Sequence, residues 1–220
     1  NISSMPYINM TLKLMNIFGI EYSFKNNTIH ISNQKYQSTE YTIEGDWSAA
    51  SYIYQLAILA TDIDLYINNI NINSLQGDRI ITDIAASLGI ITYSENNKLH
   101  IKKTKLNYPY SFFMDFVNYP DIAQTVITTF AAINIEGEIT GIESLKIKET
   151  NRIIALNKEL RKIGYSLNEI ENKPKYYKLS KIKNHIQKNN LIFETYNDHR
   201  MAMAFAPLCL KYNNITILSP

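Results

Sequence analysis

The stretch Tyr196–Ala206 reads YNDHRMAMAFA, a polar start followed by a run of small and apolar residues. Asn197 or Asp198 suits the N-cap of a helix, and the residues behind them have good helix propensity. We therefore predict a buried helix whose free N–H groups and positive dipole end lie beside Arg200. Such an arrangement favours the binding of an anion. The alternative is a capped core helix whose arginine simply faces water.

Two other segments have the same design, and the three begin 75 and 77 residues apart. They are apolar stretches that each start with an aspartate: Asp46–Ala60, Asp121–Ile133 and Asp198–Leu210. Each leads to a predicted strand, at Asp64–Ile70, Glu138–Ile142 and Asn214–Leu218. Because a helix that is apolar on all sides must be surrounded, we expect these three in the core. The aspartates can be simple caps stabilised by the helix dipole.

A second repeated pattern predicts β-hairpins. Residues 19–31 and 88–101 share a glycine, an apolar strand and the pattern Asn-Asn-x-(Ile/Leu)-His-Ile, offset by 70 residues. A less similar copy covers residues 164–179. Amphipathic helices are predicted before the first and third copies, at Pro6–Phe18 and Arg152–Lys162. The repeat unit is therefore a buried helix, a strand, an amphipathic helix and a hairpin.

This repeat predicts an α/β (α+β) fold in which buried helices are walled by sheets and the units surround a pseudo-threefold axis. A solenoid is the alternative, although solenoid repeats usually have about 20–50 residues.

The composition argues against several classes of protein. Of the 220 residues 45% are hydrophobic and 19% are charged, and the net charge of +2 disfavours nucleic acid as a partner. No apolar run is long enough for a membrane span and no signal peptide is visible. The single cysteine, Cys209, is expected to be buried, and it fits a reducing, cytoplasmic location. Because the chain starts without Met and stops on a predicted strand, we expect a fragment.

Three polar patches could carry chemistry. Asp121 begins a predicted helix, where the dipole favours a carboxylate that could act as a base. Lys146 and Lys148 are expected on one face of a strand, followed by a helix that opens with Glu149 and carries Arg152 one turn on. Glu149 and Arg152 could also be an ordinary helix ion pair. The third patch is the stretch 197–200.

Four segments together resemble the C-terminal half of the EPSP synthase (3-phosphoshikimate 1-carboxyvinyltransferase) family: residues 44–52 (EGDWSAASY), 120–125 (PDIAQT), 145–152 (LKIKETNR) and 197–204 (NDHRMAMA). Shorter matches are SLQGD at 74–78 and PYI at 6–8. The resemblance implies an inverse α/β barrel built of βαβαββ units, with the active site between two domains. Residues 1–43 would be the last unit of the N-terminal domain. Residues 44–220 would be the C-terminal domain without its final segment, with Glu44 and Gly45 near a hinge.

The family moves the enolpyruvyl group of phosphoenolpyruvate to the 5-hydroxyl of shikimate 3-phosphate, through a tetrahedral intermediate and without a metal or other cofactor. By resemblance, Asp121 is the acid–base residue at the hydroxyl, and Lys148 contacts the same oxygen and the shikimate ring. Glu149 handles protons near the pyruvyl carbon. The division of proton transfer between Asp121 and Glu149 is left open.

The resemblance also implies the residues that bind the two substrates. Arg152 and Arg200 would hold the phosphoenolpyruvate carboxylate, because guanidinium forks suit planar anions, and His199 would lie beside them. The residues implied in contacting shikimate 3-phosphate are Ser4, Tyr7, Asp121, Ser144 and Lys148.

Some features depart from the family pattern. Asn151 stands where the family commonly has an aspartate, and the family's N-terminal phosphate site and a further substrate-binding lysine would fall outside residues 1–220. The resemblance therefore predicts a chain that is inactive alone and a full-length protein that is monomeric. There are two alternatives. One is a UDP-N-acetylglucosamine enolpyruvyl transferase-like enzyme, although enzymes of that kind lack the sequence motifs found here at 148–152 and 197–203. The other is a catalytically silent anion-binding domain.

Overall fold

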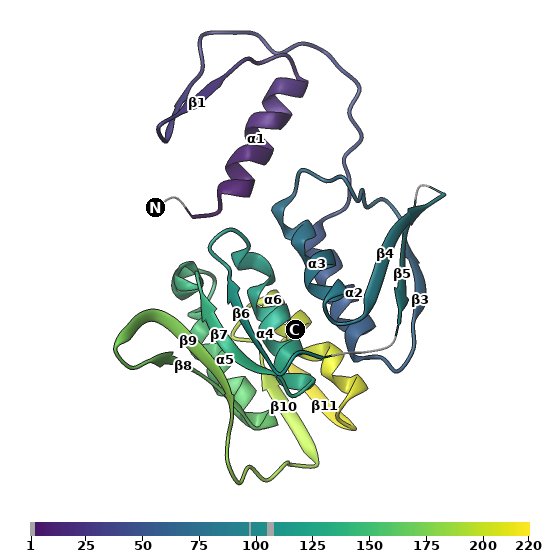
Figure 1. Ribbon diagram of the computed structural model, residues 1–220, viewed down its shortest axis with the longest axis vertical. Coiled ribbons are helices and arrows are strands. Elements are labelled where there is room, and N and C mark those ends of the chain that lie inside the picture. Colours follow the sequence, from purple (N-terminus) through teal and green to yellow (C-terminus); the bar gives the residue numbers. More distant parts are fainter. Residues whose placement is uncertain (1–2, 97, 105–107) are drawn as a thin grey trace.

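The computed structural model describes residues 3–96, 98–104 and 108–220, so Asn97 of the second predicted hairpin turn lies outside the described residues. Residues 3–43, called here the N-terminal unit, contain helix α1 (Met5–Ile17) and the antiparallel pair β1 (Ser23–Lys25) and β2 (Thr28–His30). A segment without regular structure then leads to Asp46. The unit lies above the rest of the chain in Figure 1.

Three buried helices form the centre of the remaining chain. They are α2 (Trp47–Leu59), α4 (Ala123–Ala132) and α6 (His199–Phe205). All ten residues of α4 are buried, and α4 packs against both α2 and α6. These helices confirm the prediction of an enclosed helical core. The continuous hydrophobic core runs from Trp47 to Leu208 and includes no residue of the N-terminal unit.

Sheets wall this helical core (Figure 1). The first has the order β3 (Asp64–Ile67), β5 (Lys98–Lys103), β4 (Ile90–Glu95) and is antiparallel. The second has the order β6 (Ser111–Asp115), β7 (Glu136–Thr140), β9 (Lys173–Lys181), β8 (Tyr165–Ile170), with β6 and β7 parallel. The third pairs β10 (Asn190–Glu194) with β11 (Asn214–Leu218) in parallel. Each buried helix is followed by a strand, as the repeat predicts.

Two shorter helices, α3 (Ile81–Ala86) and α5 (Arg152–Leu160), precede the second and third hairpins. The glycines that lead into the three hairpins, Gly19, Gly89 and Gly164, all have positive φ, at 84°, 84° and 81°. This left-handed conformation is unfavourable for other residues and turns the chain from the helix into the next strand. The predicted repeat therefore extends to backbone conformation.

Three predictions about local structure are wrong. Glu149 does not open a helix, because α5 begins at Arg152 and Asn151 is its N-cap. Lys146 is not in a strand but in a 3₁₀ helix at Glu143–Ile147, and Lys148 follows it in an extended conformation. Cys209 is exposed, not buried. The predicted helix 198–210 is α-helical only to Phe205 and continues as a 3₁₀ helix at Ala206–Leu210. Because the residues per turn change, Cys209 rotates away from the core.

Within the described residues, none of the helices combines the length and the apolar character that a membrane crossing requires.

Candidate active site

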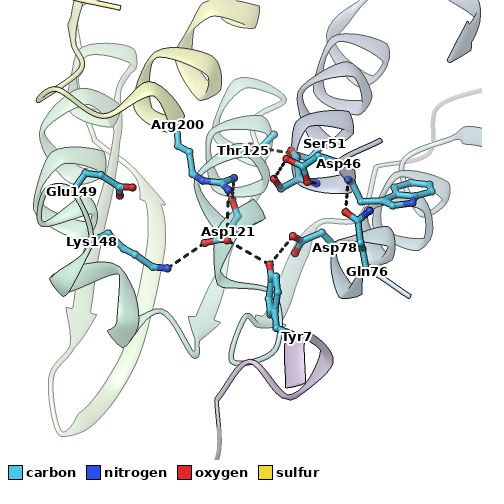
Figure 2. Close-up of polar contacts among 12 residues, drawn as sticks. Tyr7, Asp46, Ser51, Gln76, Asp78, Asp121, Thr125, Lys148, Glu149 and Arg200 are labelled. Carbon is cyan, nitrogen blue, oxygen red and sulfur yellow. Dashed lines mark hydrogen bonds and ion pairs between the residues drawn. The ribbon is translucent and has the colours of Figure 1, made fainter. Parts of the chain in front are cut away.

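Asp121 lies where three parts of the chain meet. It sits in a 3₁₀ helix at Pro120–Ile122 that leads into α4, and its side chain is 21% exposed. Lys148 Nζ is 3.4 Å from Oδ1, and Arg200 Nη2 is 3.5 Å from Oδ2. The Tyr7 hydroxyl is also 3.5 Å from Oδ2. Figure 2 shows these side chains converging on Asp121: Tyr7 comes from the N-terminal unit, Lys148 from the segment between β7 and α5, and Arg200 from α6.

The start of α6 holds Arg200 in place. Asp198 is the N-cap, and its Oδ1 accepts the backbone N–H of Arg200 at 2.9 Å. The Arg200 guanidinium reaches across to donate Nη1–H to the backbone carbonyl of Asp121 at 3.2 Å. Burial alone would lower the pKa of Arg200, but Asp121, Tyr52 and Asp46 raise it overall. Arg200 is therefore a fixed cation beside the Asp121 carboxylate.

Arg152 is held by two carboxylates. Its side chain is 1% exposed and lies between two carboxylates, with Nε 2.6 Å from Asp198 Oδ2 and Nη2 2.6 Å from Glu149 Oε2. Nη2 also donates to Asp198 Oδ1 at 3.1 Å. Nη1 is buried and has no partner among the described residues. The Glu149–Arg152 ion pair is confirmed, and the contact with Asp198 connects Arg152 to the turn that carries Arg200.

The other predicted residues, His199, Ser4 and Ser144, form no hydrogen bond or ion pair with Asp121 within the described residues. His199 is exposed at the first position of α6. Ser4 anchors the start of α1, because its N–H donates to the Val117 carbonyl at 2.8 Å and its own carbonyl accepts the N–H of Tyr7. Ser144 lines a cavity of about 600 Å³ together with Ser3 and Val117, which is not lined by Asp121, Lys148 or Arg200.

Sequence reasoning missed the roles of Asp78 and Gln76. The Tyr7 hydroxyl donates to Asp78 Oδ2 at 2.6 Å, across 71 residues of sequence. Burial raises the pKa of Asp78 to about 6, Asp121 adds to the rise, and the hydrogen bond from Tyr7 opposes it. Gln76 Oε1 accepts the N–H of Trp47 at 2.8 Å. In the sequence, these two residues were marked only by the short family match SLQGD at 74–78, which assigned no role to either of them.

The arrangement suits a reaction between anions at a carboxylate base. Asp121 is partly exposed to solvent and faces two cations, Lys148 and Arg200, so a hydroxyl and an anionic group could approach it together. Burial and the adjacent Asp78 raise the pKa of Tyr7, so its phenol stays neutral. A base, fixed cations and a neutral hydroxyl are the groups that general acid–base catalysis and charge stabilisation require.

Comparison with known proteins gives a consistent result. The profile of the EPSP synthase (3-phosphoshikimate 1-carboxyvinyltransferase) family matches residues 1–219. The 3-phosphoshikimate 1-carboxyvinyltransferase of Bacteroides fragilis (strain ATCC 25285) is 39% identical over 225 residues, covering 100% of the chain and 53% of that protein. The protein of the same name from Pasteurella multocida is 36% identical over 222 residues, covering 99% of the chain and 48% of that protein. The chain spans about half the length of the curated relatives it matches.

A solved structure of EPSP synthase from Acinetobacter baumannii superposes with a TM-score of 0.68 at 19% sequence identity. The match covers 94% of this chain and 49% of the other. It confirms the predicted fold class of buried helices within an inverse α/β barrel.

Proposed function

This chain belongs to the EPSP synthase family, and from that premise we propose that it supplies part of an enzyme that transfers the enolpyruvyl group of phosphoenolpyruvate to the 5-hydroxyl of shikimate 3-phosphate. The products are 5-enolpyruvylshikimate 3-phosphate and phosphate. One observation carries the proposal: Asp121 is contacted by Tyr7, Lys148 and Arg200, which come from three different repeat units. In this proposal residues 1–43 are the last unit of one domain and residues 44–220 form most of the next.

The first step is the addition of the hydroxyl to phosphoenolpyruvate. Asp121 takes the proton of the 5-hydroxyl while the hydroxyl oxygen bonds to C2 of phosphoenolpyruvate, and Glu149 delivers a proton to the methylene carbon C3. Lys148 Nζ lies 3.4 Å from Asp121, so it can contact the same attacking oxygen. The positive charge of Lys148 stabilises the negative charge that develops on that oxygen. The product of this step is a tetrahedral intermediate.

The second step is the elimination of phosphate. The bond between C2 and the phosphate oxygen breaks, and a proton leaves C3, which restores the carbon–carbon double bond. We assign this proton traffic at C3 to Glu149, whose carboxylate is half-exposed next to Lys148. Glu149 takes back the proton that it delivered to C3, and the proton held by Asp121 leaves with the phosphate, so both carboxyl groups return to their initial states and no oxidant or reductant is needed.

Binding of the two substrates relies on fixed cations. Arg200 is placed by the N-cap of α6 and by the Asp121 carbonyl, so its guanidinium is oriented before a ligand arrives. A preorganised guanidinium binds a carboxylate with little loss of side-chain entropy. Arg152 can contribute through Nη1, the guanidinium nitrogen that is not engaged by Asp198 or Glu149. We place His199, Ser4 and Ser144 around the same substrates.

The test uses a chimera, because the chain spans about half the length of its relatives. This chain replaces the matching half of the Bacteroides fragilis protein, and phosphate release is measured with phosphoenolpyruvate and shikimate 3-phosphate. Asp121→Asn keeps the side chain's shape but removes its basicity. We expect it to lower kcat at least about a hundredfold, as is typical for loss of a general base.

Asp62→Asn is the matched control, because Asp62 is an exposed acid that contacts only its neighbour's N–H in the described part of the chain. It should leave the rate unchanged. Turnover with UDP-N-acetylglucosamine in place of shikimate 3-phosphate would contradict the proposed acceptor. A folded chimera that binds shikimate 3-phosphate but releases no phosphate would show a silent binding domain instead.

A further inference from the structure

The segment Ser74–Asp78 contacts both the N-terminal unit and the linker, which is the name used here for Glu44 and Gly45 between that unit and α2. On the linker side, the Ser74 hydroxyl donates to Glu44 Oε1 at 2.5 Å, and Gln76 Nε2 donates to the Gly45 carbonyl at 2.8 Å. On the other side, Asp78 accepts the hydrogen of Tyr7 at 2.6 Å. This one segment therefore fixes the chain where it enters α2 and also where α1 reaches the site, as Figure 2 shows for Gln76, Asp78 and Tyr7.

The packing between this segment and α1 is close. A Cβ added at Gly77 would lie 2.4 Å from Pro6 Cβ, much closer than any normal contact between carbons. Pro6 cannot move out of the way by changing rotamer, since its ring closes on the backbone. Gly77 therefore allows Tyr7 to reach Asp78, and a methyl group at residue 77 would separate them.

Asp78 is an unusual group to bury at this place. It is 3% exposed, and its second oxygen, Oδ1, is buried without a partner among the described residues. A buried polar atom without a hydrogen bond costs about 1–3 kcal/mol. Apart from Tyr7, the charged groups around it are Asp121, Arg200 and Asp46. Because the side chain is costly for folding, its contact with Tyr7 calls for a functional explanation.

The direction in which the Tyr7 hydroxyl hydrogen points provides a functional explanation. A phenol has a single hydrogen, and the 2.6 Å contact to Asp78 is much shorter than the 3.5 Å contact to Asp121. The hydrogen therefore points at Asp78, and the lone pairs of the Tyr7 oxygen are left to face Asp121. Lys148 and Arg200 offer only hydrogens to Asp121, so Tyr7 is the neighbour that can accept one.

We propose that Asp78 is a positioning residue for the Asp121 site: by accepting the Tyr7 hydrogen it docks the N-terminal unit and turns the Tyr7 oxygen toward Asp121. The consequence for catalysis rests on the proposed function. After Asp121 takes the proton of the substrate hydroxyl, the Tyr7 oxygen accepts a hydrogen bond from the protonated Asp121. No bond to carbon changes in this contact.

The positioning is tested on the 220-residue chain itself by NMR, with ¹³C at the ζ carbon of its tyrosine rings. The Tyr7 signal is assigned by its loss in Tyr7→Phe. We expect Asp78→Ala and Gly77→Ala to move this signal to the position of an exposed tyrosine. Asp78→Asn should restore it, because an amide oxygen also accepts a hydrogen bond. Asp83→Ala, at an exposed acid in the neighbouring helix α3, is the control and should leave it unchanged.

The signals of the other tyrosines show whether each variant is folded. If Asp78→Ala does not fold, Gly77→Ala decides by the same criterion. A Tyr7 signal that stays in place in a folded Asp78→Ala or Gly77→Ala variant overturns the proposal, as does an Asp78→Asn signal that moves as far as that of Asp78→Ala.

The chimera tests the consequence for catalysis. Asp78→Ala should lower kcat about tenfold with little change in KM, the effect of losing one hydrogen bond that forms only during the reaction, and Asp78→Asn should restore most of it. In a Tyr7→Phe background Asp78→Ala should have no further effect, since both changes remove the same contact. An equal additional loss overturns the proposal. A wild-type chimera without turnover contradicts the proposed function only, because the NMR result does not depend on it.

Discussion

Arg152 and Arg200 have the same side chain but different environments. Arg200 lies at the surface of the site beside Asp121, whereas Arg152 is buried with its Nε and Nη2 atoms bound to Asp198 and Glu149. A buried guanidinium is stable only when carboxylates balance its charge. Asp198 therefore has two roles, since it also caps the helix that carries Arg200.

We predict that Asp198→Asn destabilises the fold by about 3–5 kcal/mol, because it leaves the Arg152 charge buried without its main partner. The N-cap is kept, since asparagine caps helices as well as aspartate does. Urea unfolding of the two proteins measures the difference.

Glu149→Gln is the comparison for this prediction. The Glu149 side chain is 50% exposed, so its ion pair with Arg152 should be worth at most about 1 kcal/mol. Equal losses in Asp198→Asn and Glu149→Gln would show that Asp198 is not the group that balances Arg152.

Asp78 should give the protein a measurable dependence of stability on pH. Its pKa rises from 3.8 to about 6 on folding, because burial disfavours the charged carboxylate. Between pH 4 and 6 the folded state therefore holds more protons than the unfolded state, and stability falls as pH rises. The full change corresponds to at most about 3 kcal/mol.

Asp78→Asn removes this titration while keeping the shape of the side chain. The free energy of unfolding of the variant, minus that of the wild type, should therefore increase from pH 4 to pH 7 and be constant above it. Unfolding curves at several pH values measure this difference, and other titrating groups cancel because both proteins contain them. A difference that is flat from pH 4 to 7 would contradict the predicted titration.

At the scale of elements, the three buried helices begin in two ways. Asp46 and Asp198 are N-caps, and each accepts a backbone N–H in the first turn, from Ser48 and Arg200 respectively. Asp121 instead lies in a 3₁₀ turn before α4 and does not act as a side-chain cap there. The sequence pattern suggests three equivalent caps, but in the structure the middle one is released for contacts with Lys148 and Arg200.

We therefore expect alanine substitutions at Asp46 and Asp121 to differ in how much stability they cost. Asp46→Ala should lower the free energy of unfolding by about 1 kcal/mol through loss of its cap, with little of that loss in Asp46→Asn. Asp121→Ala should cost less stability than Asp46→Ala, because partly exposed ion pairs are worth little. Urea unfolding of the three variants checks the order, and an Asp121→Ala loss as large as that of Asp46→Ala would mean that Asp121 is also a cap.

Where the sequence misled, short elements and changes of helix type were the cause. Lys146 and Lys148 alternate with apolar residues, which is typical of a strand, but five residues are too few to distinguish a strand from a 3₁₀ helix. At Cys209 the apolar run continues after Pro207, whose missing N–H interrupts α-helical hydrogen bonding. Hydrophobic periodicity carries no signal for either effect.

At the scale of the molecule, the repeat was visible in the sequence because burial and turn chemistry recur in each unit. The apolar helices, the following strands and the hairpin glycines all lie close to where these patterns predict them. The convergence of Lys148 and Arg200 on Asp121 was predicted through family resemblance, not through local pattern. The Tyr7–Asp78 contact could not be predicted, because it depends on how two distant segments pack.

The N-terminal unit depends on few contacts with the rest of the chain. Its buried apolar residues, Leu12 and Ile20, are not part of the continuous core, which begins at Trp47. The contacts that hold it include polar ones, from Ser4 to Val117 and from Tyr7 to Asp78 and Asp121, and the packing of Pro6 against Gly77. Burial of apolar surface is the main source of stability, so this unit should contribute little to it.

We therefore predict that residues 44–220 unfold cooperatively at nearly the same urea concentration as the whole chain. Backbone amides of α1 should exchange with solvent much faster than those of α4, which native-state hydrogen exchange of the whole chain measures directly. Removing residues 44–60 instead, which deletes α2 from the core, is the control and should abolish cooperative unfolding. If 44–220 lost its cooperative transition, or if α1 exchanged as slowly as α4, the boundary near Gly45 would not separate two folding units.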